Sequence, residues 1–557
     1  MQRFFEFFDS VFPVRAESQA SSIAVWLDRI IYVFILLTAL SAPLSIAATN
    51  IAWLSGMFFW LPRSLIKPRP KLFRSPIDLA LFALFAWSLI SSFLSYAPDL
   101  SLDRLRVLTL FPIAYLVCQN VRSRKTVKFL VGALIVSTMT TVIWTFVERG
   151  FGRGVQVFEV STSGPLFQAG IQNADTLLKI NGKKFSEPEE LIAALEQNET
   201  IKLNFYRPDY YADVEIKREN LSPGASVIKK LGFERWQRSR NWRSSGFYNH
   251  YTTYAEVLQL ILSLMFGIFL TLPNKKSVFG AVLLFCLILA GAALLLTGTR
   301  ASQAAFLLSA LAIVVTGASR KVLFGLIALC LPLAIVAAIY VQNTRNTSFV
   351  DASDNSTTWR LTVWHEGVEL LTKSPRHLIF GVGIDSVKRY KCDWGLFDNC
   401  TLPAGHFHST PLQIAVETGL PALFLWLLIV WQYGRSLLTV ILRDMGTWGR
   451  GDAGILDETE FQKLKMTKEK RNSLTNIPPS PRPRVSPSQW TLPISASKFE
   501  RGVLLGTFGG LIGFFASGVV HYNLGDSEVA MVFYLVMGLA LVLIRDGNPT
   551  IKESVLL

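Results

Sequence analysis

Charged residues and cysteines are scarce in this sequence. Asp, Glu, Lys and Arg make up only 17% of the 557 residues, whereas 51% are hydrophobic. This composition excludes an ordinary soluble protein and indicates a membrane protein that crosses the bilayer many times. Five cysteines are too few to build a disulfide scaffold. No cleavable signal peptide is expected, because the first apolar run is long and lacks a small-residue cleavage site.

Acidic residues are also in the minority, since 40 Asp and Glu stand against 55 Lys and Arg. In a membrane protein such an excess indicates basic loops on the cytoplasmic side, so no nucleic-acid partner is inferred. The sequence contains twelve apolar runs. With twelve spans the basic loops all fall on one side of the membrane, which places both termini in the cytoplasm and residues 148–251 and 342–410 outside. The expected spans are 23–46, 47–62, 77–96, 103–119, 127–147, 252–272, 277–297, 302–317, 321–341, 411–432, 502–521 and 528–545.

These patterns predict a mainly α fold, a polytopic transmembrane helical bundle of about 12 spans with a small α+β domain inserted into it. The polar, Pro- and Ser-rich part near the C-terminus is typical of a disordered linker. The predicted parts are N-terminal spans (1–149), the inserted domain (150–220), a membrane core with an outward catalytic loop at 342–410 (221–433), a cytoplasmic linker (434–500) and C-terminal spans (501–557).

The inserted domain has the pattern of short strands and one helix. β-branched runs at 155–160, 176–180 and 201–206 alternate with turns. A helix is expected to follow Ser186 as its cap, with Pro188 in its first turn and Glu189 completing a capping box. The order resembles a PDZ domain of the bacterial periplasmic type, on Ser163-Gly164-Pro165, Ala169-Gly170-Ile171, Asp175 and Ile180-Asn181-Gly182.

This resemblance implies binding of an extended peptide or a protein C-terminus, added as a strand beside the sheet. The peptide carboxylate would lie against the backbone N–H groups of residues 151–155. The implied peptide-binding residues are Gly152, Gly154 and Val155. The alternative is a spacer or oligomerisation element that binds no peptide end.

Two histidines precede the apolar run 414–431. His406 and His408 lie one residue apart on a segment that carries Pro and Gly. Histidine can transfer a proton near neutral pH, and ionisable groups at the mouth of a membrane protein are candidates for function. The alternative is a pair of interfacial histidines that only face water.

A basic and aromatic stretch, residues 236–254, leads into another span. Arginine and tryptophan at a bilayer face suit lipid phosphates and sugar rings, although an aromatic belt has the same composition. The candidate substrate-binding residues in this stretch are Arg243, Asn249 and His250.

Four motifs occur in a characteristic order over residues 246–431. They resemble those of the O-antigen ligase and polymerase superfamily of bacterial membrane glycosyltransferases, with Ser409 in place of the usual Asn. The resemblance implies a GT-C-like bundle, glycan donors on undecaprenyl diphosphate, no metal, and functional roles for Arg300, Arg360 and His408. The motifs are Thr297-Gly298-Thr299-Arg300, Trp359-Arg360, Gly381-Val382-Gly383 and His406-Phe407-His408-Ser409.

These residue types suit such a reaction. Two arginines can hold a diphosphate and stabilise the charge that develops on it, which requires no metal. A neutral histidine can remove the proton of an acceptor hydroxyl. We therefore expect His408 to be the base and Arg300 and Arg360 to hold the diphosphate, with inversion at the anomeric carbon. His406 is the second choice of base or an acceptor-binding residue.

Cys392 and Cys400 lie in the predicted outward loop. The bacterial periplasm is oxidising and the spacing is short, so a disulfide is expected. A metal site shared with His406 and His408 is the weaker alternative, and we assign no metal. Cys118, Cys286 and Cys330 lie in or beside apolar runs and are expected to be packing residues.

Other classes of membrane protein fit less well. A zinc protease needs H-E-x-x-H, but the sequence has Glu369 where the second histidine would stand. A serine protease site is suggested only by Ser517 and His521. A transporter is disfavoured because the spans carry few acidic residues, and a PDZ-based scaffold is the other non-enzyme alternative. Within the favoured family, transfer to lipid A-core, polymerisation of glycan repeats and transfer to protein all stay open.

Overall fold

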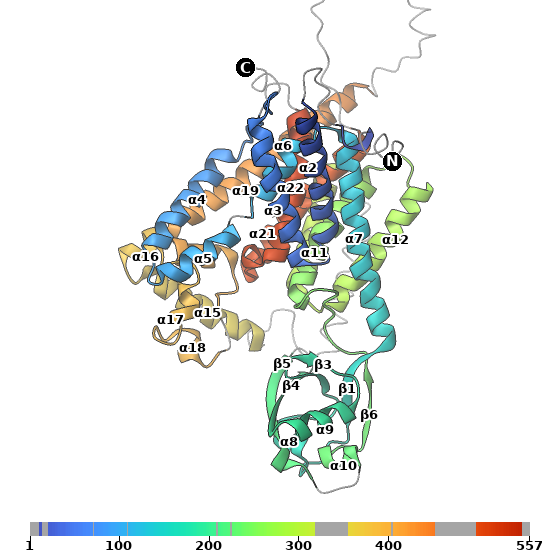
Figure 1. Ribbon diagram of the computed structural model, residues 1–557, viewed down its shortest axis with the longest axis vertical. Helices are drawn as coiled ribbons and strands as arrows, with labels where there is room; N and C mark the ends of the chain where they lie inside the picture. Colours follow the sequence, from blue (N-terminus) through green and yellow to red (C-terminus); the bar gives the residue numbers. More distant parts are fainter. Residues whose placement is uncertain are drawn as a thin grey trace, which may run out of the picture. The chain divides into compact units, whose positions relative to one another are not determined.

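The computed structural model describes residues 10–13, 21–70, 72–108, 110–207, 210–222, 226–317, 355–402, 405–451 and 497–547. The chain divides into two compact units, and Figure 1 labels their helices and strands. Unit 1 consists of Met1–Thr138, Ala255–Ile288 and Arg300–Leu557, and unit 2 of Met139–Tyr254 and Leu289–Thr299.

Helices dominate the fold. Eight helices in the described ranges are long and apolar enough to cross a membrane, so the chain is a multi-pass membrane protein. They are α2 (Ser22–Ser41), α7 (Arg124–Phe151), α11 (Tyr251–Thr271), α12 (Val278–Leu296), α13 (Arg300–Gly317), α19 (Thr410–Gly451), α21 (Lys498–Val520) and α22 (Ser527–Gly547).

Two further predicted spans form helices that are not among these eight. The run 47–62 forms α3 (Ile46–Leu65), a 20-residue helix with Pro62 inside it. The run 77–96 forms the shorter α4 (Asp78–Phe93), which has 16 residues. Both segments are helical as predicted, but their crossing of the membrane stays a prediction.

The last two predicted spans have different outcomes. The run 103–119 is divided into α5 (Pro98–Leu108) and α6 (Pro112–Asn120). A proline lacks the N–H that a continuing helix needs, which explains a new helix at Pro112. The run 321–341 lies outside the described residues, so the total of about 12 spans is not established.

Glycines on α21 allow this helix to pack closely against α11. A Cβ on Gly267 of α11 would overlap the backbone of both Gly502 and Gly506. Small residues permit such close helix packing inside a membrane, where apolar burial alone favours no particular neighbour. This contact fixes the position of α21, whose C-terminal end leads directly into the candidate site.

The same helix packs antiparallel to α13. Gly509 lies against Ile313, and one turn farther along Gly513 lies against Ser309. Both helices advance by one turn from the first pair to the second. The same pairing therefore places the first turn of α13 level with the C-terminal end of α21. Arg300, the first residue of α13, therefore lies at the end of the bundle where α21 finishes.

Between α13 and α19 the described residues form a packed layer of short helices. Its core includes Val363, Leu370, Val387 and Phe407, which are buried together. The first of these helices carries Trp359 and Arg360. They are α15 (Asn355–Thr372), α16 (Pro375–Phe380), α17 (Ser386–Tyr390) and α18 (Leu396–Cys400).

Unit 2 contains a six-stranded antiparallel sheet with the order β5-β4-β2-β1-β6, in which β3 pairs with β2. Apolar side chains from the strands and from one helix form its core, among them Val155, Leu177 and Leu191. The elements are β1 (Arg153–Phe158), α8 (Pro165–Gln168), β2 (Thr176–Ile180), β3 (Lys183–Lys184), α9 (Pro188–Gln197), β4 (Thr200–Arg207), β5 (Tyr210–Lys217), η1 (Arg218–Asn220), α10 (Val227–Leu231) and β6 (Arg235–Ser239).

The three predicted strands of the insert are present as β1, β2 and β4. The strand β6 was not predicted, and it lies beyond residue 220, where the sequence placed the end of the inserted domain. Two of the five residues of its sequence, RWQRS, are arginines and three are exposed, so it lacks the apolar alternation that marks a half-buried strand.

The predicted cap of the insert helix was wrong by one residue. Glu187, rather than Ser186, is the N-cap, and Glu190, rather than Glu189, completes the capping box. Pro188 occupies the first helical position, where its missing N–H is not needed. That placement makes residue 187 the cap.

The polar linker also begins later than predicted. The helix α19 continues to Gly451, so residues 434–451 are helical rather than part of a linker that starts at 434. Leu437, Val440 and Ile441 are buried on this part of the helix, which explains its continuation. Residues 452–496 of the predicted linker lie outside the described residues.

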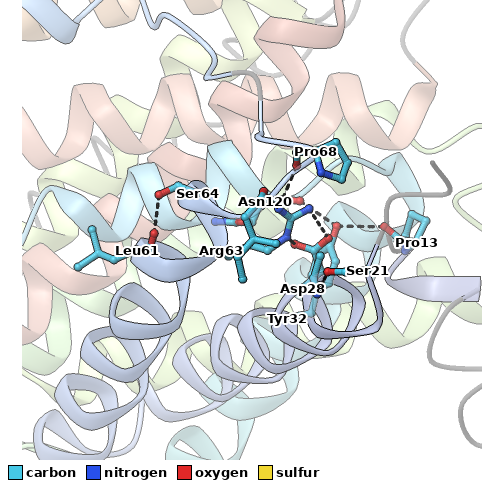
Figure 2. A network of polar contacts seen from close by, with 11 residues as sticks. Pro13, Ser21, Asp28, Tyr32, Leu61, Arg63, Ser64, Pro68 and Asn120 are labelled. Carbon is cyan, nitrogen blue, oxygen red and sulfur yellow. Dashed lines mark hydrogen bonds and ion pairs between the residues drawn. The ribbon is translucent and has the colours of Figure 1, made fainter. Parts of the chain in front are cut away.

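A buried ion pair holds α2 and α3 together (Figure 2). The Arg63 Nε atom lies 2.7 Å from the Asp28 Oδ1 atom. Arg63 also donates to the carbonyls of Ile66, at 3.2 Å, and Pro68, at 3.1 Å, and only 1% of this residue is exposed. Water cannot take the place of Asp28 beside the buried Arg63 guanidinium. Loss of Asp28 would therefore leave an uncompensated buried charge.

The Asp28→Asn substitution is expected to destabilise the protein by about 3–5 kcal/mol, because it leaves the buried Arg63 charge uncompensated. The measurement is thermal unfolding in detergent. The matched control is Asp103→Asn, which breaks an exposed pair with Arg106 and should cost less than about 1 kcal/mol. Equal unfolding temperatures for the two variants would contradict a structural role for the buried pair.

Candidate functional site

The two predicted histidines lie against each other at the start of α19. Their ring centroids are 4.0 Å apart. The His408 ring packs edge-on against Trp359 of α15 at 4.6 Å, and the His406 ring lies 5.7 Å from the ring of Tyr522. Residues from three distant parts of the sequence therefore meet around this pair.

The backbone at His408 has an unusual conformation. Its φ angle is +49°, in the left-handed region that residues with a side chain seldom adopt. The preceding carbonyl of Phe407 accepts a hydrogen bond from Trp364 Nε1 at 3.0 Å, and the Phe407 N–H donates to Gln413 Oε1 at 2.8 Å. Surrounding contacts thus hold a strained residue in place, as is common at functional sites.

The hydrogen bonding of His406 indicates its protonation state. The backbone N–H of His408 donates to His406 Nδ1 at 3.2 Å. Burial lowers the pKa of His406 to about 4, so its ring is neutral at pH 7. With Nδ1 accepting a hydrogen bond, the single ring proton lies on Nε2. His406 is therefore arranged as a hydrogen-bond donor and is a poor choice of general base.

The two arginines predicted from sequence lie on different helices of unit 1. Arg360 follows Trp359 on α15, and the Trp359 ring contacts His408. Arg300 begins α13, and the helix register brings it to the end of the bundle where α21 finishes. Arg360 is thus one residue from a direct neighbour of His408, whereas Arg300 is assigned to the same end of unit 1.

The remaining predicted substrate-binding residues belong to the other unit. Arg243, Asn249 and His250 lie in unit 2. The guanidinium of Arg243 lies over the ring of Tyr251, 4.8 Å from its centroid. The ring of His250 stacks on the same tyrosine at 4.3 Å. Their part in binding substrate stays a prediction.

Sequence reasoning missed a buried acid beside the histidine loop. Glu256 of α11 lies 2.9 Å from His521 Nδ1, and both side chains are largely buried. The His521 carbonyl accepts a hydrogen bond from the Thr410 N–H at 3.1 Å. The pair therefore joins α11 and the end of α21 to the loop that carries His408. A lone glutamate early in an apolar helix was the signal that could have identified it.

The two protease alternatives gain no support from these contacts. Ser517 Oγ donates to the Phe514 carbonyl at 3.2 Å and accepts from Asn523 at 3.0 Å, while His521 pairs with Glu256. Ser517 and His521 thus each have other partners. In the zinc-like motif, Glu366 accepts hydrogen bonds from backbone N–H groups at the start of α18, which is a structural role.

The predicted disulfide is confirmed. Cys392 and Cys400 are bonded, with their Cα atoms 5.1 Å apart. The bond closes the segment that contains α18, which packs against α15. It therefore braces the helix that carries Trp359 and Arg360.

A membrane-impermeant maleimide is expected to label neither Cys392 nor Cys400 until a reductant is added. After reduction, labelling should rise by two thiols per chain, because the bond consumes both. Mass spectrometry of the labelled peptides gives the count. The double variant Cys392→Ser/Cys400→Ser should show no rise with reductant. Full labelling of both cysteines in untreated protein would contradict the disulfide.

The predicted peptide-binding residues of the insert have a neighbour within the chain. Gly152 and Gly154 have φ angles of +78° and +69°, which favour glycine. The strand β1 pairs with β2 on one side and with β6 on the other, and Val155 lies opposite Arg238 of β6. Both edges of β1 are thus occupied, so a peptide could be added beside it only after β6 moved.

A family comparison covers the histidine site. Residues 284–427 match the model of the O-antigen ligase family. The matched segment contains Arg300, Arg360, His406 and His408, and it excludes the sheet insert. No curated protein matches the chain. The chain is thus a multi-pass membrane protein whose residues 284–427 are similar to the O-antigen ligase family.

Proposed function

We propose that this protein transfers a glycan from an undecaprenyl-diphosphate carrier to a hydroxyl acceptor, as an O-antigen ligase does. The observation that carries the proposal is the position of His408. It lies within the segment that matches the ligase family, in a strained backbone conformation, against the tryptophan that precedes Arg360. An imidazole held in this way against the helix that carries Arg360 suits acid–base chemistry next to an anionic leaving group.

The proposed reaction is a single displacement. The acceptor oxygen forms a bond to the anomeric carbon while the bond from that carbon to the diphosphate oxygen breaks. His408 takes the proton of the acceptor hydroxyl, and Arg300 and Arg360 stabilise the negative charge left on undecaprenyl diphosphate. Attack from the side opposite the leaving group inverts the anomeric carbon. No metal takes part in these steps.

His406 has a different role in this proposal. Its neutral ring presents Nε2–H as a donor, because Nδ1 accepts from the backbone of His408. It would therefore hold an acceptor oxygen or a phosphate oxygen by a hydrogen bond rather than remove a proton. The Glu256–His521 pair supports the loop from behind through the contact between His521 and Thr410.

The proposed location follows from the charge pattern of the loops. Basic loops lie on one side of the predicted spans, which favours that side as the cytoplasm of a bacterial inner membrane, together with both termini. The histidine loop and the sheet insert would then face the periplasm. The lipid-linked donor and the acceptor would meet the site from that side.

The test is transfer by purified protein in liposomes that contain an undecaprenyl-diphosphate glycan. Three acceptors are supplied separately: lipid A-core, a second carrier-linked glycan and an unfolded protein. Glycosylated product with any one of them supports the proposal, and the acceptor that works separates ligase, polymerase and protein O-oligosaccharyltransferase. Movement of the unchanged glycolipid across the bilayer without product would favour a transporter instead.

The sheet insert is proposed to be a PDZ-like domain. The order of β1, β2, α9 and β4, with left-handed glycines just before the core of β1, supports this assignment. Its ligand would be an extended peptide or a protein C-terminus, which would need to displace β6. A spacer or scaffold role is the alternative, and peptide binding separates the two.

The Gln237→Pro substitution is expected to increase binding of C-terminal peptides to the full-length protein by at least tenfold. Proline in the middle of β6 removes an N–H and opposes pairing with β1 at Gln156. Fluorescence anisotropy with a random C-terminal peptide library measures the change. The control is Gln172→Ala, a substitution in an exposed loop of the same domain. A proline at Gln168 would be unsuitable, because it would alter α8. No binding by either protein would favour the spacer.

A further inference from the structure

Unit 1 contains a cavity with both polar and apolar lining residues, one of which, Tyr522, has a ring contact with His406. Its volume is about 90 Å³, which leaves room for several water molecules. Residues of α4, α5 and α19, of the turn between α16 and α17, and of the segment after α21 line it. The residues that matter for its chemistry are Ser88, Arg104, Asp385, Glu417 and Tyr522.

The charges around the cavity do not suit an anion. The Nε atom of Arg104 lies 2.9 Å from the Asp385 Oδ2 atom, so the one cation already faces a carboxylate. Glu417 is buried with only 3% of its surface exposed, and its Oε1 accepts a hydrogen bond from the Asp385 N–H at 2.8 Å. Two carboxyl groups and one guanidinium favour a neutral ligand with several hydroxyl groups over a diphosphate.

A buried hydroxyl supplies an independent indication of a ligand. Ser88 is 1% exposed, and its Oγ has no hydrogen-bond partner among the described residues. It lines the cavity. Buried polar groups in folded proteins nearly always have a partner, so this hydroxyl is expected to bond to a group that enters the cavity.

The loop that presents Asp385 is rigidly held. Asp385 has a φ angle of +58°, in the left-handed region. The carbonyl of the preceding Ile384 accepts a hydrogen bond from Ser101 Oγ at 2.8 Å, and the Ser386 hydroxyl lies 2.9 Å from that of Ser95. A strained acidic residue fixed on both sides is typical of a binding position.

The walls of the cavity match both sides of a sugar ring. Leu84 and Leu524 are apolar lining residues, and they also line a neighbouring apolar cavity. Tyr522 adds an aromatic ring that touches His406, at 5.7 Å between centroids. A sugar has polar edges and an apolar face, so it could bond to the carboxylates while its face packs on these side chains.

We infer that this cavity binds one sugar ring of a glycan substrate. The carboxyl groups of Asp385 and Glu417 form hydrogen bonds with sugar hydroxyls, the Ser88 hydroxyl forms another, and Tyr522 packs against the ring between it and His406. The inference rests on the proposed function. The ring comes from either the donor glycan or the acceptor glycan, and the test below distinguishes them.

The test measures binding rather than transfer, with the full-length protein in lipid nanodiscs. In the donor arm, undecaprenyl diphosphate N-acetylglucosamine is compared with undecaprenyl diphosphate. In the acceptor arm, lipid A-core is compared with lipid A. The variant Ser88→Met fills the cavity, and the second variant Asp385→Asn keeps its shape but removes a charge. Ile90→Met is the matched control, because Ile90 lies on the same helix as Ser88 but is 45% exposed.

In one arm, wild-type protein should bind the sugar-bearing probe at least tenfold more tightly than its sugar-free partner. Ser88→Met and Asp385→Asn should remove that preference, and Ile90→Met should keep it. The arm in which the variants lose the preference shows whether the ring belongs to the donor glycan or to the acceptor glycan. A preference that survives in both cavity variants, or no preference in either arm, overturns the sugar site. If wild-type protein prefers the sugar-bearing probe but transfers no glycan in the liposome assay, the result counts against the proposed reaction and not against the sugar site.

Discussion

Replacing His408 by alanine is expected to lower the rate of glycan transfer by about 10²–10⁴-fold, the usual contribution of a general base. His408 is the histidine suited to this role, because Nδ1 of His406 already accepts a hydrogen bond from the backbone. The rate is measured with purified protein in liposomes. Binding of the lipid-linked donor should change little, since the proton moves only during bond formation.

Two controls separate loss of the base from loss of the loop. His408→Asn keeps a residue that tolerates the left-handed backbone, and it should be as inactive as alanine. His365→Ala removes a histidine that is 73% exposed, and it should keep wild-type activity. Activity in His408→Asn within threefold of wild type would reject His408 as the base.

Replacing Arg360 or Arg300 by methionine is expected to reduce transfer by about 10²–10³-fold each, because charge develops on the diphosphate as the glycosidic bond breaks. The loss should appear mainly in kcat. Lysine restores the charge without the planar, two-pronged geometry, so Arg360→Lys should recover only part of the rate. Initial rates at saturating donor concentration measure the effect.

The matched control for these arginines is Arg389→Met. Arg389 is half-exposed and pairs with Asp99 at the surface, so its loss should alter the rate less than twofold. Full recovery by lysine at both positions would indicate that only positive charge is needed. Wild-type rates in both methionine variants would exclude the diphosphate clamp.

Sequence alone was informative where function depends on neighbouring residues in the chain. His406 and His408 are two positions apart, and Cys392 and Cys400 are eight apart, so both pairs were predicted and both are observed in contact. Arg360 was identified from the short motif Trp359-Arg360, which lies on α15. Short-range patterns therefore identified most of the candidate catalytic groups.

The parts that depend on helix packing were not predictable. Glu256 meets His521 because glycines let α21 lie closely against α11, and no sequence pattern sets that register. The sugar cavity likewise combines Ser88 with Asp385, residues nearly three hundred positions apart. The strand β6 was missed because its exposed residues are polar and show no apolar alternation. Tertiary contact, rather than local preference, determines each of these features.

The histidine site is proposed to transfer a glycan from its diphosphate carrier. The most direct measurement is the simultaneous yield of glycosylated acceptor and released undecaprenyl diphosphate in liposomes, for wild type and His408→Asn. We predict one released carrier for each product formed by wild type, and neither from the folded variant. Equal yields from both proteins, or carrier release without any transfer to an acceptor, would contradict the claim.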